Sequence, residues 1–371
     1  MGKLNALIDL SRRYGSDPAW VLAGGGNSSW KDGRVMRVKA SGTALGTIGE
    51  GGFCAVDLDR LDAIWDKAYP EAADEREAAV LADLMASRLP GEDRRPSVET
   101  LMHGLFPRAY VLHTHPALVN GMACGLRGRE AFEELLAEIA VWVPFVEPGY
   151  VLARRVREEL EAFATRRGRL PDAMVMQNHG LLVAADDTGG IDRLSGEVVS
   201  RIRSRITRHP DVSAAAVDAG ALSAARSVLS GLAGAGTAIA FRSDAEILSR
   251  ASSPGLFHPL SSAFTPDHIV YAGHEFLYVA EAAAAEAAWT DYVSRNASNP
   301  RVAVMRGLGA FGIGPNAAAA ETALALFADA CAIAAYAESF GGALHMSKFM
   351  VDFIRGWEVE RYRSAMLRGG A

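Results

Sequence analysis

Cysteine is scarce in this 371-residue sequence, and neither sign of charge dominates it. The three cysteines, Cys54, Cys124 and Cys331, lie far apart without C-x-x-C spacing, which excludes a disulfide framework and a thiolate zinc cluster. Lys plus Arg total 38 against 44 Asp plus Glu, a formal net charge of −6. No overall field therefore favours nucleic acid or an anionic membrane, and any anion site must be local. A reducing cytoplasm is the expected location.

Long uncharged hydrophobic runs are also lacking. The most weakly charged stretch, residues 317–337, contains Glu321 and Asp329, which predicts an alanine-rich buried helix rather than a membrane span. The first ten residues contain no apolar signal region, so we expect neither secretion nor a membrane partner. Half of the residues are hydrophobic, and the length accommodates two to three domains with sizeable cores.

Helical and strand patterns alternate in the first half and predict a mixed α/β fold. Helical periodicity covers residues 3–14, 129–141 and 151–166, and short apolar strands are expected at 110–112 and 173–176. The composition shifts to Ala, Gly and Ser around residues 208–237. We therefore predict one domain over residues 1–210 and a smaller α/β domain over residues 211–371.

Two strings share one pattern, AMVMQNHGLLVAAD at 173–186 and RVAVMRGLGAFGIGP at 301–315. Each predicts a strand, a tight glycine turn, a second strand and then a long helix. The alignment matches Gly180 with Gly309 but places Leu308 where the first string has His179. The second domain is thus interpreted as a degenerate repeat of part of the first, without its chemistry, and convergent packing is the alternative.

Three of the nine histidines have spacing typical of a metal site. His113 and His115 alternate on a predicted strand, so their side chains project to the same face. His179, at the end of another strand, can supply a third ligand. Three imidazoles leave the fourth tetrahedral position of a catalytic zinc open for water or substrate.

Five ordered segments resemble the class II aldolase/adducin family over about residues 5–210. They are Gly26-Asn27-Ser28, Ser41-Gly42-Thr43, Ser97-Val98-Glu99 with His103, His113-Thr114-His115-Pro116 and Asn178-His179-Gly180. Within that family the sequence is most similar to the aldolase half of bifunctional rhamnulose-1-phosphate aldolase/dehydrogenase proteins. The resemblance implies an α/β/α domain with a mostly antiparallel central sheet.

The resemblance also implies a reaction and its residues. His113, His115 and His179 would hold Zn²⁺, or another divalent metal, and Glu99 would be the catalytic base. The implied reaction cleaves a ketose phosphate, rhamnulose-1-phosphate-like, to dihydroxyacetone phosphate and a small aldehyde through a metal-stabilised enediolate. The alternative for Glu99 is an ordinary carboxylate in the first turn of a helix. The family further implies a homotetramer with active sites between subunits and a tyrosine proton donor from a neighbour, which none of the nine tyrosines identifies.

A phosphate site is implied at glycine and serine turns. Its candidate residues are Gly26, Asn27, Ser41, Gly42, Ser97 and Lys39. Glycine lets backbone N–H groups approach phosphate oxygens, and hydroxyls add donors. Lys39 could add a cation, or it could be a solvated strand lysine. Many family members have a second serine where this chain has Val98, so a non-phosphorylated substrate stays open.

Other functions compete with the aldolase interpretation. Residues 307–312 form a G-x-G-x-x-G string, but a dinucleotide site needs a helix directly after it, so no nicotinamide cofactor is expected. The family also contains sugar-phosphate epimerases and oxo-acid phosphate decarboxylases. A non-enzymatic, adducin-like interaction module is the alternative from a different class.

Overall fold

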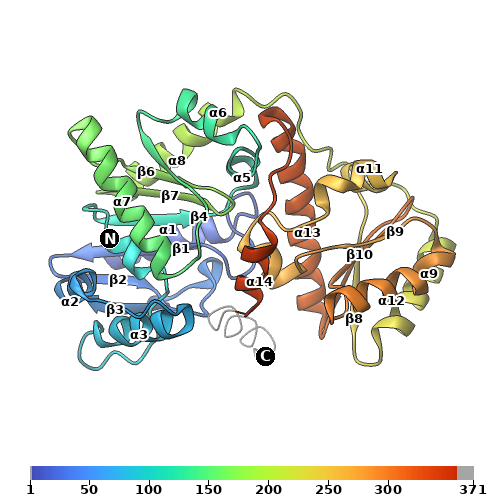
Figure 1. Ribbon diagram of the computed structural model, residues 1–371, viewed down its shortest axis with the longest axis horizontal. Helices are drawn as coiled ribbons and strands as arrows, with labels where there is room; N and C mark the ends of the chain where they lie inside the picture. Colours follow the sequence, from blue (N-terminus) through green and yellow to red (C-terminus); the bar gives the residue numbers. More distant parts are fainter. Residues whose placement is uncertain (1, 357–371) are drawn as a thin grey trace. The chain divides into compact units, whose positions relative to one another are not determined.

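The computed structural model describes residues 2–356 and divides them into two compact units (Figure 1). The first unit comprises residues up to 123 together with 129–205, and the second comprises 124–128 together with the residues from 206 onward. The sequence predicts this boundary after residue 210, whereas the main segment of the second unit begins at Ile206. The short segment 124–128 interrupts the first unit along the chain, and no sequence pattern pointed to it.

The first unit is built on a seven-stranded sheet in the order β3-β2-β1-β4-β7-β6-β5. All neighbouring strands are antiparallel except β5 and β6, which are parallel. The strands are β1 Asn27–Asp32, β2 Val35–Lys39, β3 Phe53–Asp57, β4 Tyr110–Thr114, β5 Ala140–Val143, β6 Ala173–Met176 and β7 Gly180–Ala185. The predicted mostly antiparallel sheet is confirmed.

Helices cover both faces of this sheet. α1, α5 and α8 pack on one face, and α4 and α7 pack on the other with α2 and α3. They are α1 Lys3–Gly15, α2 Leu58–Asp62, α3 Ala73–Ala86, α4 Thr100–Gly104, α5 Ala117–Ala123, α6 Gly128–Leu135, α7 Tyr150–Arg167 and α8 Thr188–Arg203. Because both faces are covered, β4, β6 and β7 are buried along their whole length. The sequences of β6 and β7 are accordingly continuous apolar runs rather than alternating ones.

One predicted helix, over residues 129–141, is partly wrong. α6 ends at Leu135, and Ala140–Val143 forms β5, which pairs in parallel with β6. Val141, Trp142 and Val143 are β-branched or aromatic residues that suit a pleated, buried surface. Pairing with β6 therefore outweighs the continuing helical pattern.

The second unit contains a four-stranded sheet in the order β8-β11-β10-β9. Its strands are β8 Ala238–Arg242, β9 Leu277–Val279, β10 Val302–Met305 and β11 Gly309–Gly314. Its helices are α9 Ala219–Ala233, α10 Ala245–Ala251, α11 Pro254–Phe257, α12 Ala285–Asn296, α13 Ala317–Ala337 and α14 Lys348–Gly356. A core that includes Trp289, Tyr292 and Phe311 lies between the sheet and the helices α9 and α12.

The strand pairing of the second sheet matches that of β4, β7, β6 and β5 in the first. Met305 pairs with Gly309 as Met176 pairs with Gly180, β9 lies parallel to β10 as β5 lies parallel to β6, and β8 lies antiparallel to β11 as β4 lies to β7. The following helices start alike, because the side chains of Asn316 and Asp187 each accept a bond from the backbone N–H three residues on. The register supports the predicted degenerate repeat.

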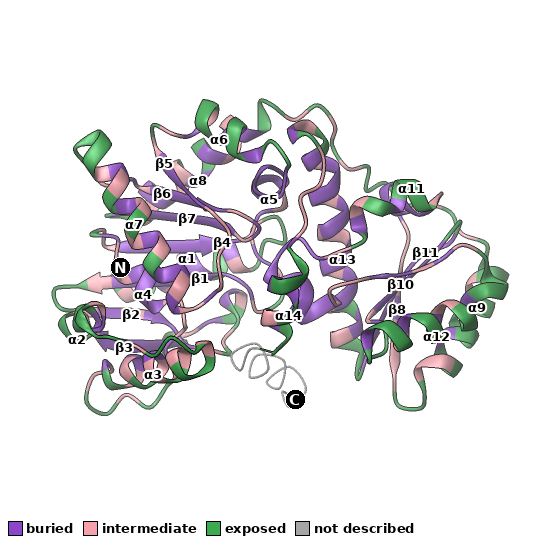
Figure 2. Cartoon of the chain, in the orientation of Figure 1, coloured by how far each residue is buried: buried purple, intermediate pink, exposed green. Residues whose placement is uncertain are grey.

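α13 is long and apolar enough to cross a membrane by length and composition alone. Half of its most apolar 18-residue window is nevertheless buried inside the protein, and the helix packs along β11 and β8 (Figure 2). Leu324, Phe327 and Ile333 are among its buried residues. This packing supports the predicted alanine-rich core helix.

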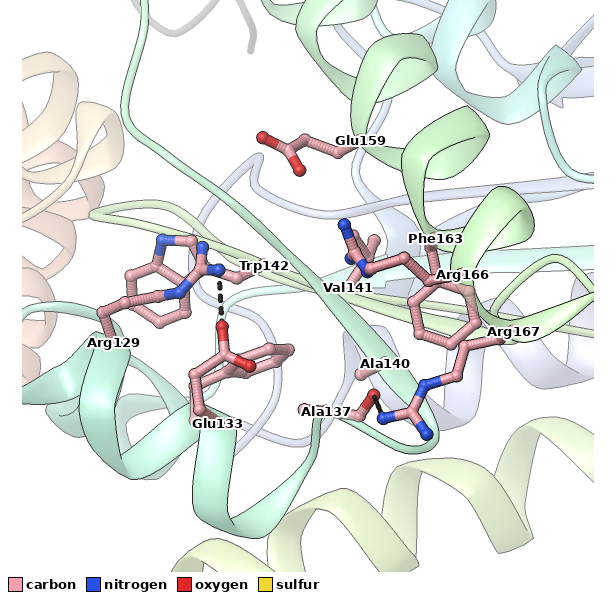
Figure 3. A pocket seen from close by; sticks show the side chains of 11 residues that line it. Arg129, Glu133, Ala137, Ala140, Val141, Trp142, Glu159, Phe163, Arg166 and Arg167 are labelled. Carbon is pink, nitrogen blue, oxygen red and sulfur yellow. Dashed lines mark hydrogen bonds and ion pairs between the residues drawn. The ribbon is translucent and has the colours of Figure 1, made fainter.

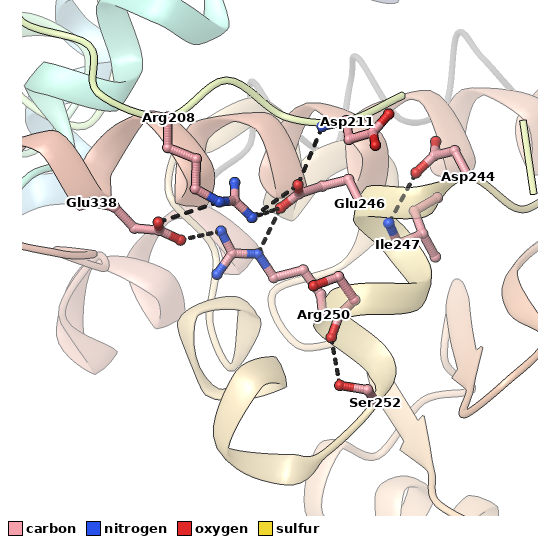
Figure 4. A network of polar contacts seen from close by, with 9 residues as sticks. Arg208, Asp211, Asp244, Glu246, Ile247, Arg250, Ser252 and Glu338 are labelled. Carbon is pink, nitrogen blue, oxygen red and sulfur yellow. Dashed lines mark hydrogen bonds and ion pairs between the residues drawn. The ribbon is translucent and has the colours of Figure 1, made fainter. Parts of the chain in front are cut away.

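A charged cluster of Arg208, Glu246, Arg250 and Glu338 braces the second unit (Figure 4). Arg208 donates to both carboxylate oxygens of Glu246 at 2.9 Å, and Arg250 donates to Glu246 at 2.8 Å and to Glu338 at 2.6 Å. The side chains of Glu246 and Arg250 are almost fully buried. The cluster thereby links the segment before α9 to α10 and to the turn that follows α13.

Candidate functional site

The candidate residues gather at one end of three central strands. Asn27, the first residue of β1, lies directly opposite His113 on β4, and His113 lies opposite Leu182 on β7. β6 and β7 are joined by the three-residue turn 177–179, in which Asn178 has a φ of 54°. This left-handed turn brings His179 to the same end of the sheet as His113.

The three predicted metal ligands converge. Nε2 of His113 lies 3.2 Å from Nε2 of His115, and the ligand nitrogens of His113, His115 and His179 all lie within 4.8 Å of one another. Gly180 makes this approach possible, since a Cβ there would lie 2.5 Å from the carbonyl oxygen of Thr114 and 2.7 Å from the His115 ring. Any side chain at position 180 would displace the histidine pair.

These donors fit a divalent metal. Nitrogens bound tetrahedrally to zinc at the usual ~2.0–2.1 Å stand roughly 3.3 Å apart, close to the separation of the first two histidines. Histidine is a borderline ligand that suits zinc and several other transition metals, so the donor set does not select one of them.

Glu99 lies beside this triad. Its Oε1 is 3.1 Å from Nδ1 of His113 and 3.7 Å from Nε2 of His179. Glu99 is the residue preceding α4, but its side chain makes no helix-capping hydrogen bond. Its carboxylate instead faces His113 and His179. Burial raises the pKa of Glu99. The neighbouring histidines, His113 above all, lower it by more than burial raises it, so the pKa of Glu99 lies well below its usual value.

Asn27 connects the glycine turn to Glu99. Its Nδ2 donates a 2.9 Å hydrogen bond to Oε2 of Glu99. Gly26, with a φ of 67°, packs so closely on the His113 backbone that a Cβ would lie 3.0 Å from the carbonyl oxygen. The structure thus assigns the Asn27 amide nitrogen a contact with the candidate base.

The three turns expected to bind phosphate are linked to one another. Lys39 is almost fully buried, and its Nζ donates to the carbonyl oxygens of Thr43 at 2.8 Å and Gly24 at 3.3 Å. The alternative of a solvated lysine is wrong. The backbone N–H of Ser41 donates to the carbonyl oxygen of Arg95, and the Ser97 hydroxyl oxygen accepts from the backbone N–H of Glu99. Gly42 has a φ of 83°, which favours glycine.

The comparisons with known proteins bear on the family of this chain. The model of the class II aldolase and adducin N-terminal domain matches residues 5–189. A solved class II aldolase domain from Thermoplasma acidophilum is 31% identical, with 55% of this chain and 93% of that chain covered and a TM-score of 0.45. The chain belongs to the class II aldolase and adducin family.

Two further proteins are similar to part of this chain. An uncharacterized oxidoreductase of Bacillus subtilis (strain 168), YuxG, is 31% identical over 185 residues, which are 47% of this chain and 25% of the relative. The chain thus spans about a quarter of the length of that curated relative. The L-fuculose-1-phosphate aldolase of Thermus thermophilus is 13% identical, with coverages of 54% and 91% and a TM-score of 0.34.

Several residues around the class II aldolase-like site were not anticipated. The carbonyl oxygen of Trp20 accepts a 2.9 Å hydrogen bond from the backbone N–H of His115. Asn120 on α5 donates through Nδ2 to the carbonyl oxygen of His179 at 3.2 Å. His103, to which the sequence motif gives no role, is fully buried, and its Nδ1 lies 2.8 Å from the Ser29 hydroxyl oxygen. Each contact joins segments far apart in the chain, so spacing alone carried no signal for it.

The G-x-G-x-x-G string has an ordinary structural role. Gly307 and Leu308 form the turn between β10 and β11, and the string continues into β11 rather than a helix. α13 begins only at Ala317. The geometry required for a dinucleotide fingerprint is therefore missing from these residues.

A separate pocket in the first unit lies between α6, β5 and α7 (Figure 3). Arg129 pairs there with Glu133 at 2.5 Å, and Arg167 donates to the carbonyl oxygen of Ala137. None of the candidate site residues lines it. Two of its arginines, Arg129 and Arg167, are thus engaged in contacts with neighbouring segments.

Proposed function

We propose that the first unit is a metal-dependent lyase that cleaves the carbon–carbon bond of a ketose phosphate. The expected substrate resembles rhamnulose 1-phosphate, and the products are dihydroxyacetone phosphate and a small aldehyde. The observation that carries the proposal is the convergence of His113, His115 and His179 with the Glu99 carboxylate 3.1 Å from His113. Family membership supports a lyase of the aldolase type.

Zinc is the metal we propose, held by the three histidines. A divalent cation there would supply Lewis-acid stabilisation of the negative charge that cleavage leaves on oxygen, an effect of several kcal/mol. The chain's own task is to present three neutral imidazoles. The close approach at Gly180 and the His115 backbone bond to Trp20 hold two of them in place.

Glu99 is proposed as the proton carrier. In the cleavage direction the hydroxyl proton of the aldehyde fragment leaves, the carbon–carbon bond breaks, and a carbon of the ketone fragment gains a proton. Glu99 would return that proton to carbon and would remove it in the synthetic direction. Asn27 would orient its carboxylate through Oε2. A positioned acid or base of this kind contributes ~10²–10⁴-fold in rate.

The linked turns are proposed as the phosphate site. Gly26, Ser41, Gly42 and Ser97 belong to three segments that Lys39 and backbone bonds connect. The half-buried Val98 offers no hydroxyl, so the unphosphorylated ketose remains part of the test.

The assembly and setting are also proposals. We expect a homotetramer with active sites between subunits, one of which supplies a tyrosine as proton donor, in a reducing cytoplasm. All three cysteines are buried and free. We also propose that the chain is related to the aldolase half of proteins with two activities. The match to the curated oxidoreductase, which covers only a quarter of that relative's length, supports this relationship.

A retro-aldol screen tests the proposal. The protein, stripped of metal and reloaded with zinc, is offered ketose 1-phosphates and their unphosphorylated forms, and the released carbonyl products are identified. Aldolase activity gives two carbonyl fragments, an epimerase gives an isomer of the substrate, and a decarboxylase acting on oxo-acid phosphates gives carbon dioxide. A chain that takes up well under one equivalent of zinc and releases no product would favour the adducin-like alternative.

A further inference from the structure

The short helix α5 touches both parts of the candidate metal site. It begins two residues after His115, packs against β6 and β7, and its Ala123 carbonyl oxygen accepts from the N–H of Asn178. Asn120, midway along α5, donates from Nδ2 to the carbonyl oxygen of His179 at 3.2 Å. α5 therefore connects the segment that carries His113 and His115 with the turn that carries His179.

Asparagine at position 120 is unfavourable for the stability of the fold. Its side chain is fully buried, and its Oδ1 has no hydrogen-bond partner within residues 2–356. A buried amide oxygen left unsatisfied costs about 1–3 kcal/mol. A leucine of similar size would avoid that cost, so the stability of the fold does not explain the asparagine.

The second unit supplies an internal comparison. A Cβ on Gly309 would lie 2.5 Å from the Arg242 carbonyl oxygen, as a Cβ on Gly180 would from that of Thr114. When Gly309 is aligned with Gly180 and Arg242 with Thr114, the counterparts of His113, His115 and His179 are Phe241, Ser243 and Leu308.

The same alignment extends into the following helix. α10 covers seven residues, as α5 does, and begins three residues after Arg242, as α5 begins three residues after Thr114. Leu248 then corresponds to Asn120. The asparagine is thus absent from the copy that has lost the three histidines, while the packing glycine is kept.

We propose that Asn120 is a positioning residue that fixes the His179 turn, and through it the third metal ligand. This inference rests on the proposed metal site. By holding the backbone oxygen, Asn120 limits rotation of the turn, so the imidazole of His179 stays aimed at the nitrogens of His113 and His115. Loss of an outer-shell partner of a metal ligand typically costs 10–100-fold in metal affinity.

Zinc titration of the metal-free protein tests the role. Asn120→Leu, which reproduces the residue of the second unit, is expected to weaken zinc binding 10–100-fold while the free energy of unfolding of the metal-free protein stays equal or rises. Asn120→Asp, nearly isosteric, places a carboxylate oxygen against the His179 carbonyl and is expected to weaken binding as well. If Asn120 only filled space, its replacement would not weaken zinc binding while leaving the free energy of unfolding equal or higher.

A matched control and the wild-type titration separate the possible failures. Asn296→Leu changes another buried asparagine, whose Nδ2 donates to the Tyr292 carbonyl oxygen, and is expected to leave zinc affinity unchanged. If wild-type protein binds zinc and Asn120→Leu binds it equally tightly, the role of Asn120 is wrong while the metal site stands. If wild-type protein binds no zinc, the proposed function itself fails.

Discussion

Asn27 and Glu99, 72 residues apart in the chain, are joined by a 2.9 Å hydrogen bond from Nδ2 to Oε2. Asn27 also lies directly opposite His113 in the β1–β4 ladder. Glu99 is thus held by two neighbouring central strands, through the amide of one and the imidazole of the other. A carboxylate fixed in this way is prepared for proton transfer at one defined position.

Asn27→Ala should lower kcat without releasing the metal. A hydrogen bond to a charged group contributes about 1.5–3 kcal/mol, so we expect kcat to fall roughly 10–100-fold. The measurement is kcat for the best substrate of the retro-aldol screen, with zinc content determined on the same sample. Unchanged turnover would show that Asn27 does not position the base.

His113→Ala and Glu99→Gln should separate metal binding from proton transfer. His113→Ala removes a ligand, and we expect zinc and activity to be lost together. Glu99→Gln keeps a side chain of similar shape without its basicity, so we expect zinc to be retained and the rate to drop ~10²–10⁴-fold. Full turnover of Glu99→Gln would mean that another group is the base.

Gly180→Ala tests the close approach between β7 and the histidine pair. The added Cβ would lie 2.7 Å from the His115 ring, so we expect zinc affinity to fall at least 10-fold. Gly309→Ala is the matched control, because it creates the same 2.5 Å clash with a carbonyl oxygen in the second unit. It should destabilise that unit and leave zinc binding unchanged; equal loss of zinc in both variants would contradict this explanation.

His103 should make the stability of the metal-free protein sensitive to acid. Burial lowers the pKa of His103 from 6.5 to about 3. The unfolded chain therefore takes up a proton that the folded protein refuses, and the free energy of unfolding falls as the pH drops from 6.5 toward 3. Between pH 7 and pH 5 this difference is worth about 2 kcal/mol.

Urea unfolding at those two pH values checks the effect. His103→Asn is expected to lose less stability than wild type between pH 7 and pH 5. His209→Asn, which replaces an exposed histidine, should follow the wild-type pH dependence. An identical pH dependence for wild type and His103→Asn would rule out this contribution.

Glu246→Leu tests the charged cluster of the second unit. The substitution leaves Arg208 and Arg250 close together, the latter almost fully buried. Removing one partner of a buried ion pair costs about 3–5 kcal/mol, so thermal unfolding of this unit should shift clearly to lower temperature. Glu286→Gln, at an exposed site on α12, should have little effect, and neither variant should change zinc affinity.

Local sequence patterns determined the elements and the chemical inventory. The H-x-H pair and the apolar strands at 110–112 and 173–176 predicted β4, β6 and the ligand types, because side-chain alternation and imidazole chemistry are local properties. The two glycine-turn strings likewise predicted equivalent hairpins, since both place glycine where the strands begin to pair.

Only the tertiary structure decided which side chains meet. Residues 140–141, which the sequence predicts as helix, belong to β5 because they pair with β6, 33 residues further along the chain. The contacts of Asn27 with Glu99, Lys39 with Gly24 and Asn120 with His179 all depend on strand order and turn geometry. Sequence spacing does not encode such contacts, because they arise when distant segments close onto one end of the sheet and must satisfy their buried polar groups there.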